Sequence, residues 1–91
     1  MVTVHLPANL VRMMGMSERR LQVQGTTVGE VLSALEAAQP GLWDRLCEAD
    51  GSIREHVNIF VGEANARIDG GAALVVPEGA EVWVIPAVSG G

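Results

Sequence analysis

Residues 27–35 of the chain, TVGEVLSAL, carry the pattern of one amphipathic helix. Thr27 followed three residues later by Glu30 makes a capping box, in which a hydroxyl and a carboxylate satisfy free amides at a helix start. Four apolar residues then recur at the spacing of one helical face: Val28, Val31, Leu32 and Leu35. Pro40 and Gly41 predict that the helix ends near Gln39.

Upstream of this helix, the alternation of apolar and polar residues predicts two strands. The first covers residues 2–6 and ends at Pro7, and the second covers residues 21–24 and ends at Gly25. Between them, residues 9–19 have a mixed pattern and are predicted to form a loop.

Downstream of the helix, residues 42–46 suggest one short helical turn, and residues 57–61 alternate as a third strand. Residues 62–73 have turn residues at both ends, with room for one short strand between them. Residues 82–85 form the last predicted strand, which Pro86 stops.

This order of elements predicts an α+β protein of the β-grasp, or ubiquitin-like, architecture. We expect a mixed sheet of four to five strands with one main helix packed on one face. A right-handed crossover through the helix then places the last strand parallel beside the first. We expect residues 1–91 to form a single domain, in which residues 87–91 are a flexible C-terminal tail that ends in two glycines.

Composition excludes several classes of function. The 91 residues hold six arginines, no lysine and eleven acids, for a net charge of −5, which makes nucleic-acid binding unexpected. No apolar run approaches the ~18 residues of a membrane span, and we expect neither a membrane association nor a signal peptide. A single cysteine, Cys47, cannot form an internal disulfide and suits a reducing cytoplasm.

Metal and cofactor sites are also unexpected. Cys47, His5 and His56 are too few for a four-ligand zinc site or for an iron–sulfur cluster held by four thiolates. A nucleophilic pair of Cys47 with a histidine is conceivable. However, a cysteine within a predicted helix is more often a small buried apolar residue. We therefore expect no enzyme activity, no metal and no bound cofactor.

Three stretches resemble the ThiS/MoaD family of ubiquitin-like sulfur carriers: residues 27–35, residues 57–62 (VNIFVG) and residues 77–91 (PEGAEVWVIPAVSGG). The last of them looks like the family's final strand, proline, small-residue linker and terminal diglycine. Residues 9–19 and 63–74 match least. The ending is most similar to the carrier of cysteine biosynthesis and to the small subunit of molybdopterin synthase, and we favour the carrier.

The resemblance implies that Gly91 is the chemical site. In the family, the carboxylate of the last glycine is adenylated by an activating enzyme that uses ATP, and is then converted to a thiocarboxylate, here a 1-thioglycine at Gly91. The sulfur passes to an accepting biosynthetic enzyme. Gly90, Ser89 and Val88 would form the path into the activating enzyme, because a glycine backbone passes through a narrow channel without side-chain clashes.

The outward face of the sheet is the candidate partner surface. The alternation predicts that four valines face the helix: Val4, Val57, Val82 and Val84. It then turns five side chains outward on neighbouring strands: Thr3, His5, Phe60, Trp83 and Ile85. An aromatic pair on such a face is typical of a partner surface, for a transient complex of a chain that is monomeric when free. Alternatively, the two aromatics are singly exposed or covered by the loop of residues 9–19.

Three other functions stay open at this point. In a protein modifier, Gly91 would form an isopeptide bond to lysines of other proteins. In a constitutive subunit such as that of molybdopterin synthase, the tail would sit permanently in a partner's active site. In a plain β-grasp interaction domain, the terminus would have no role.

Overall fold

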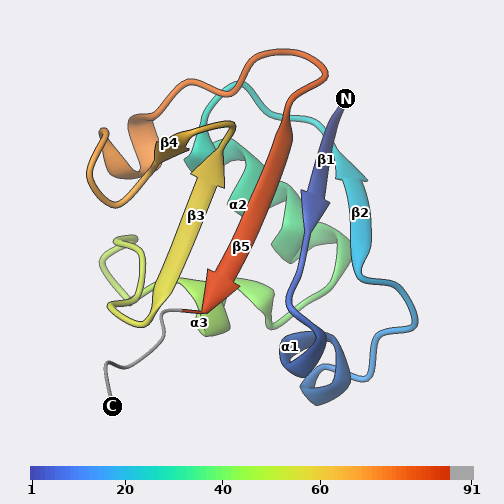
Figure 1. Cartoon of the computed structure of the whole chain (residues 1–91). Helices are drawn as coiled ribbons and strands as arrows, with labels where there is room; N and C mark the ends of the chain where they lie inside the picture. Colours follow the sequence, from blue (N-terminus) through green and yellow to red (C-terminus); the bar gives the residue numbers. More distant parts are fainter. Residues whose placement is uncertain (87–91) are drawn as a thin grey trace.

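The computed structural model describes residues 1–86, and Figure 1 shows how the elements are arranged. The strands are β1 (Val2–His5), β2 (Arg20–Val23), β3 (Val57–Val61), β4 (Ala64–Asn65) and β5 (Glu81–Pro86). The helices are α1 (Ala8–Met13), α2 (Val28–Ala38) and α3 (Leu42–Leu46), with a 3-10 turn η1 (Gly71–Ala73) before β5.

The strands form one mixed sheet in the order β2-β1-β5-β3-β4. β1 and β5 run parallel at the centre, and the other neighbouring strands are antiparallel. α2 crosses one face of this sheet (Figure 1). The predicted β-grasp fold, with the last strand parallel beside the first, is therefore confirmed.

The core lies between α2 and the inner face of the sheet. The apolar face predicted for the helix is buried, with Val28, Val31, Leu32 and Leu35 each no more than 2% exposed. The four valines predicted to face it are buried as well: Val4, Val57, Val82 and Val84. Full burial of side chains of this size stabilises a fold by about 1.5–3 kcal/mol each, so this layer holds the sheet in its curvature and register.

The start of α2 differs in one detail from the predicted capping box. The Glu30 amide donates to Thr27 Oγ1 at 3.2 Å, as predicted. The Glu30 carboxylate, however, accepts from the backbone amide and the hydroxyl of Thr26, at 2.7 and 2.8 Å, and not from the amide of Thr27. A bridge between Thr27 and Val75 joins this helix start to the connection before β5, through the Val28 amide, which donates to the Leu74 carbonyl, and the Val76 amide, which donates to the Thr26 carbonyl.

The prediction of a loop over residues 9–19 is wrong, because α1 occupies its first part. Leu10 and Val11 are buried in the core, and this packing stabilises a helix whose N-cap makes no side-chain hydrogen bond. Gly15 ends the helix in a left-handed conformation, with φ of 68°. Its amide donates to the Arg12 carbonyl and the Met16 amide to the Val11 carbonyl, which is a Schellman motif.

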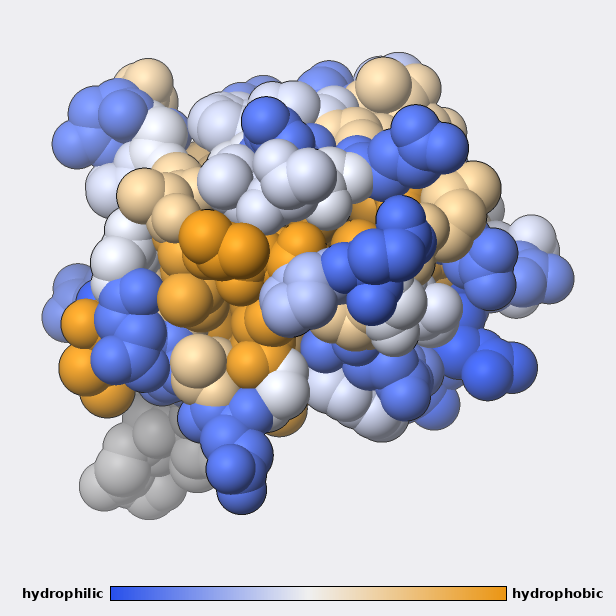
Figure 2. Space-filling model, turned by 90° about the horizontal axis from the view of Figure 1, so that it is seen from above, coloured by the Kyte–Doolittle hydropathy of each residue, from blue (hydrophilic) through white to orange (hydrophobic). Residues whose placement is uncertain are grey.

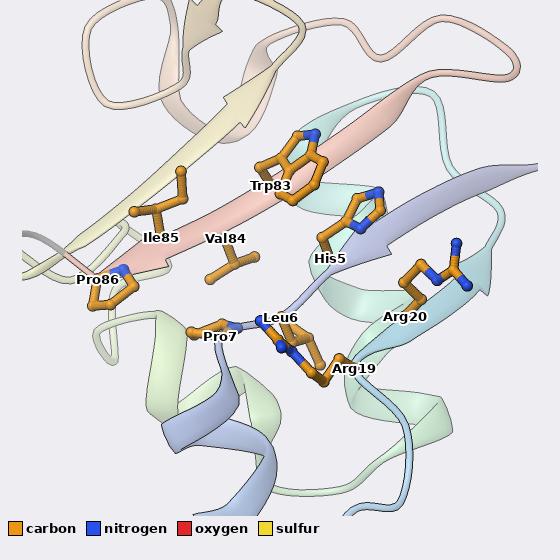
Figure 3. Close-up of a pocket in the computed structure, with 9 residues that line it drawn as sticks. All are labelled: His5, Leu6, Pro7, Arg19, Arg20, Trp83, Val84, Ile85 and Pro86. Atoms are coloured by element: carbon orange, nitrogen blue, oxygen red, sulfur yellow. The ribbon is translucent and has the colours of Figure 1, made fainter.

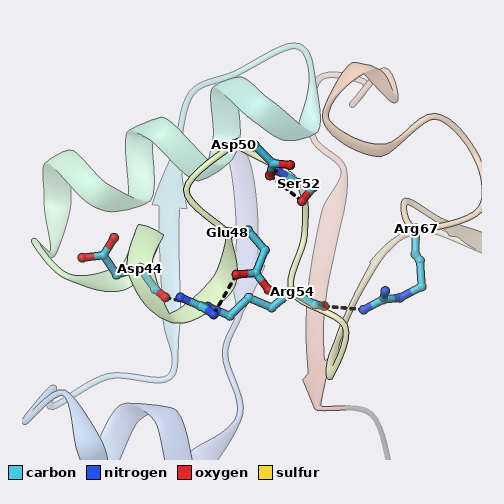
Figure 4. A network of polar contacts seen from close by, with 6 residues as sticks. All are labelled: Asp44, Glu48, Asp50, Ser52, Arg54 and Arg67. Atoms are coloured by element: carbon cyan, nitrogen blue, oxygen red, sulfur yellow. Dashed lines mark hydrogen bonds and ion pairs between the residues drawn. The ribbon is translucent and has the colours of Figure 1, made fainter.

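A network of polar contacts ties down the segment between α3 and β3 (Figure 4). Arg54 Nε donates to the Asp44 carbonyl at 2.8 Å, and Arg54 Nη1 lies 3.0 Å from Glu48 Oε1. From the far side, Arg67 Nη2 donates to the backbone carbonyls of Arg54, Glu55 and Val57. These contacts fix the start of β3 and with it the register against β5.

The connection between η1 and β5 passes over one end of the sheet. Figure 2 looks onto this end and shows apolar residues gathered in the middle, with hydrophilic residues around them. Five residues of the connection line a depression beside Trp83: Leu74, Val75, Pro77, Gly79 and Ala80. Across residues 1–86, no helix has the length and apolar character needed to span a membrane.

Candidate functional site

The candidate site is the outer face of the sheet, where the register aligns four side chains in a row across four strands. His5 on β1 is paired with Arg20 on β2 and with Trp83 on β5. Trp83 is paired in turn with Phe60 on β3. Because paired residues point to the same side of a sheet, Arg20, His5, Trp83 and Phe60 form one continuous row. We call it the outer row.

Trp83 is held in place by His5. The two rings stack nearly parallel, with their centroids 3.7 Å apart and an angle of 5° between their planes. His5 Nε2 also lies 2.6 Å from Oε1 of Glu81, which precedes Trp83 by two residues on β5. The imidazole of His5 is stacked on one face and hydrogen-bonded at its edge, so it has few alternative rotamers. The indole of Trp83, which stacks on this fixed ring, is therefore oriented before any partner arrives.

The outer row and Ile85 are accessible to a partner. Trp83 is 46% exposed and Ile85 is 42% exposed, while His5 and Phe60 are half-buried. The segment that follows α1 does not cover Trp83. Instead, Arg19 and Arg20 at its end form one border of an open groove.

This groove has a volume of about 560 Å³ and runs along β5 from Trp83 to Pro86 (Figure 3). Its walls come from β1 and the residues after it, from the start of β2 and from β5: His5, Leu6, Pro7, Arg19, Arg20, Trp83, Val84, Ile85 and Pro86. The groove ends at Pro86, the last residue that the structure describes. The predicted tail residues Val88, Ser89, Gly90 and Gly91 lie outside the described residues.

Cys47 is buried, at 1% exposure, as the sequence predicted. Burial raises the pKa of the Cys47 thiol from its ordinary value of 9.0 to about 11, against the smaller opposite effect of the Arg54 charge. A thiol with such a pKa is almost wholly protonated at neutral pH and is a poor nucleophile. Among residues 1–86 there is no cluster of three or more His, Cys, Asp or Glu side chains that could hold a metal ion.

Sequence reasoning missed three residues of the site, Arg19, Arg20 and Glu81. Arg20 was detectable in principle, because the hairpin of the first two strands opposes it to His5. Placing it needed the register, and the register depends on how many residues α1 and its turn take up. Glu81 precedes the predicted last strand by one residue and was outside the pattern.

A ubiquitin-like β-grasp body whose sheet presents an accessible aromatic row is typical of one class of protein, the small ubiquitin-like carriers and modifiers. The ThiS family model matches residues 4–91, and the chain belongs to the ThiS family.

Relatives cover the chain almost completely. The sulfur carrier protein CysO of Mycobacterium tuberculosis is 36% identical over 92 residues, which are 99% of this chain and 98% of the relative. Small archaeal modifier protein 1 of Haloferax volcanii is 38% identical over 86 residues, 92% of this chain and 93% of the relative. In the crystal structure of the Amycolatopsis orientalis BexX/CysO complex, a matching chain has a TM-score of 0.88 and 30% identity, with both chains fully covered.

Proposed function

We propose that the chain is a sulfur carrier whose Gly91 carboxylate is adenylated by an activating enzyme and converted to a thiocarboxylate. The thiocarboxylate then donates sulfur in the biosynthesis of cysteine or of a sulfur-containing cofactor. The observation that carries this proposal is the match to the ThiS family, which runs through the final Gly90-Gly91, joined to similarity with a sulfur carrier over nearly the whole chain.

The chemistry asks for an activated carboxylate, because a carboxylate itself is a poor electrophile. A Gly91 oxygen attacks the α-phosphorus of ATP and pyrophosphate leaves, which yields an acyl-adenylate. A sulfur donor at the oxidation level of sulfide then attacks the acyl carbon and AMP leaves. ATP belongs to the activating enzyme, and the chain binds no cofactor and catalyses no step itself.

The tail supplies reach and access. Five residues in a fully extended chain span about 17 Å at ~3.3–3.6 Å per residue, so in this proposal residues 87–91 are long enough for Gly91 to enter an enclosed site while the body stays outside. An enclosed site is needed because water would hydrolyse the acyl-adenylate. Val88, Ser89 and Gly90 form the access path in this proposal, and Gly90 is the position with no side chain to clash.

The outer face is the proposed docking surface for the activating and accepting enzymes, through His5, Phe60, Trp83 and Ile85. Two fully exposed aromatics would gain at most about 8–12 kcal/mol on burial, and here Trp83 and Phe60 are already partly covered. Association costs of about 4–15 kcal/mol offset most of that gain. A short-lived complex results, as a carrier that visits two enzymes in turn requires.

The proposed location of the chain is the cytoplasm. Its single cysteine, Cys47, is a free thiol buried in the core, which fits a reducing compartment.

The test is mass spectrometry of the C-terminal tryptic peptide after incubation with sulfide, ATP and a cognate activating enzyme. Trypsin cleaves after Arg67 in the denatured protein, and residues 68–91 contain neither methionine nor cysteine. A thiol-reactive label therefore attaches to this peptide only through a thiocarboxylate. Whole-protein mass would mislead, because replacing oxygen by sulfur adds nearly the mass of one methionine oxidation.

Two variants serve as controls. Deletion of Gly91 is expected to abolish loading, and Gly90→Ala to slow it, with unchanged thermal unfolding in both cases. Normal loading of the Gly91 deletion would overturn the assignment of the site. An unlabelled wild-type peptide would overturn the carrier function, provided that the same enzyme preparation loads its own carrier.

A protein modifier is the second candidate, favoured by the 38% identity to Small archaeal modifier protein 1. In that function Gly91 forms an isopeptide bond to a lysine of another protein. The chain has no lysine, so it cannot be linked to itself through side chains. A modifier predicts covalent conjugates of higher mass on a denaturing gel, and these disappear when Gly91 is deleted.

A further inference from the structure

The groove along β5 has a charge opposite to that of the whole chain. Two of the six arginines, Arg19 and Arg20, line it, and none of the eleven acids does. Within residues 1–86 neither guanidinium takes part in an ion pair or a side-chain hydrogen bond. Glu18 and Glu81 lie on the other side of Arg20, in the neighbouring depression. Glu81 is engaged there with His5.

The groove combines this charge with an apolar wall. Trp83 and Ile85 of β5 form one wall, and Arg19 and Arg20 stand on the opposite border, with Leu6 and Pro7 between (Figure 3). A guanidinium binds a carboxylate in a two-pronged geometry, and aromatic and arginine side chains are the residues most enriched in binding hot spots. An extended segment lying along β5 would place its apolar side chains on Trp83 and Ile85 and its acidic side chains on the arginines.

We propose that this groove binds an acidic segment of the activating enzyme, with apolar side chains on Trp83 and Ile85 and carboxylates paired with Arg19 and Arg20. The identity of the partner rests on the proposed function, whereas the chemistry of the segment rests on the groove alone. Because the groove ends at Pro86, a partner held there also receives the start of the tail. The arginines thus select the partner, and the tail enters its active site.

A nucleotide or free phosphate is a less suitable occupant. The groove is open and mostly apolar, and its two cations stand on one border. Phosphate sites usually surround the anion with backbone amides at a helix start or in a loop. The part of β1, β2 and β5 that lines the groove is strand backbone, whose amides bind neighbouring strands.

The experiment is a titration of the isotope-labelled whole chain, followed by NMR, with three synthetic peptides. The first alternates glutamate and leucine, the second has lysine in place of glutamate, and the third has serine in place of leucine. The reporters are the indole N–H of Trp83 and the Nε–H groups of Arg19 and Arg20. We expect the first peptide to give saturable shifts at all three reporters. The other two peptides should bind with an affinity at least about tenfold lower.

The matched variants are R19Q/R20Q and R12Q. Arg12 is also an exposed arginine, but it lies outside the groove. We expect R19Q/R20Q to reduce the affinity for the first peptide about tenfold and to remove its advantage over the lysine peptide. R12Q should stay within about twofold of the wild type. The backbone carbonyl of Arg19, which accepts from the Leu6 amide, is retained in the double variant, and thermal unfolding verifies the fold.

Three results would overturn the proposal. One is the absence of saturable shifts at Trp83 with the first peptide. Another is equal binding of the glutamate and lysine peptides. The third is a stronger response of the same reporters to AMP or inorganic phosphate, which would make the groove an anion site. The titration uses neither ATP nor sulfide, so a failure of sulfur loading at Gly91 is detected separately and leaves this result readable.

Discussion

On β5, Val82 and Val84 face α2 and are 2% and 4% exposed, whereas Trp83 and Ile85 alternate with them and are 46% and 42% exposed. The inner side chains are fixed by close packing against the helix, and any change of their volume is felt throughout the core. The outer side chains are packed less closely, and Trp83 is oriented by its stack with His5. Large apolar side chains on the solvent side contribute little to folding. The exposure of Trp83 and Ile85 therefore supports the proposal that they form a partner surface.

The largest expected effect comes from the inner face. Ile59 is fully buried at the centre of β3. Ile59→Ala leaves a cavity under α2 and should lower the free energy of unfolding by about 2–5 kcal/mol. Chemical denaturation measures this loss. Where the variant is still folded, its partner binding should match that of the wild type, and a loss of binding beyond the unfolded fraction would contradict the separation of the two faces.

Trp83→Ala should give the opposite result. The stack with His5 and the partial burial of the indole are worth about 1 kcal/mol to folding. Loss of a central aromatic anchor should cost about 2 kcal/mol or more in partner binding, roughly a thirtyfold weaker complex. A chemical melt beside a binding titration separates the two quantities. A fall in stability as large as that of Ile59→Ala would show that the outer face belongs to the core.

The start of α2, the helix that covers the inner face of the sheet, predicts a dependence of folding stability on pH. Hydrogen bonds from the amide and the hydroxyl of Thr26 lower the pKa of Glu30 below its ordinary 4.5. The folded chain therefore binds fewer protons than the unfolded chain just below pH 4.5, and this contribution to stability is present above that pH and is lost on acidification. Glu30→Gln should reduce the slope of stability against pH in this window, measured by denaturation at several pH values, without affecting partner binding. Equal slopes would contradict the assignment.

The smallest effect is expected for Glu81→Gln, with Glu63→Gln as an exposed control. Glu81 acts through His5 on the orientation of Trp83 and does not belong to the core. The free energy of unfolding should change by less than about 0.5 kcal/mol. The indole resonance of Trp83 should shift and partner affinity fall about twofold, because the side chain is less well oriented before binding. An unmoved indole resonance would show that the stack needs no support from Glu81.

The central part of the fold was predictable because its residues repeat. Alternation on β1, β3 and β5 assigned each side chain to a face, and the apolar spacing of α2 assigned the cover of the core. α1 was missed because six residues hold too few turns to show a period, and its stability comes from burying Leu10 and Val11 and from the turn at Gly15.

The site was predictable only where it lies on those repeating strands. His5, Phe60, Trp83 and Ile85 follow from the alternation, and the structure places them on the outer face. Arg19 and Arg20 depend on how the turn after α1 returns to the sheet, which no local pattern specifies. The three carbonyls bound by Arg67 likewise come from a segment distant in sequence.

The most direct test of the central claim examines the protein as it occurs in its own cells. The purified protein is denatured and digested with trypsin, and the C-terminal peptide, residues 68–91, is treated with a thiol-reactive label. The mass of this peptide is then measured by mass spectrometry. We predict that part of this peptide carries the label at Gly91, and that none does when Gly91 is deleted. If the peptide ends only in a plain carboxylate, or is found joined to lysines of other proteins, the chain is not the sulfur carrier proposed here.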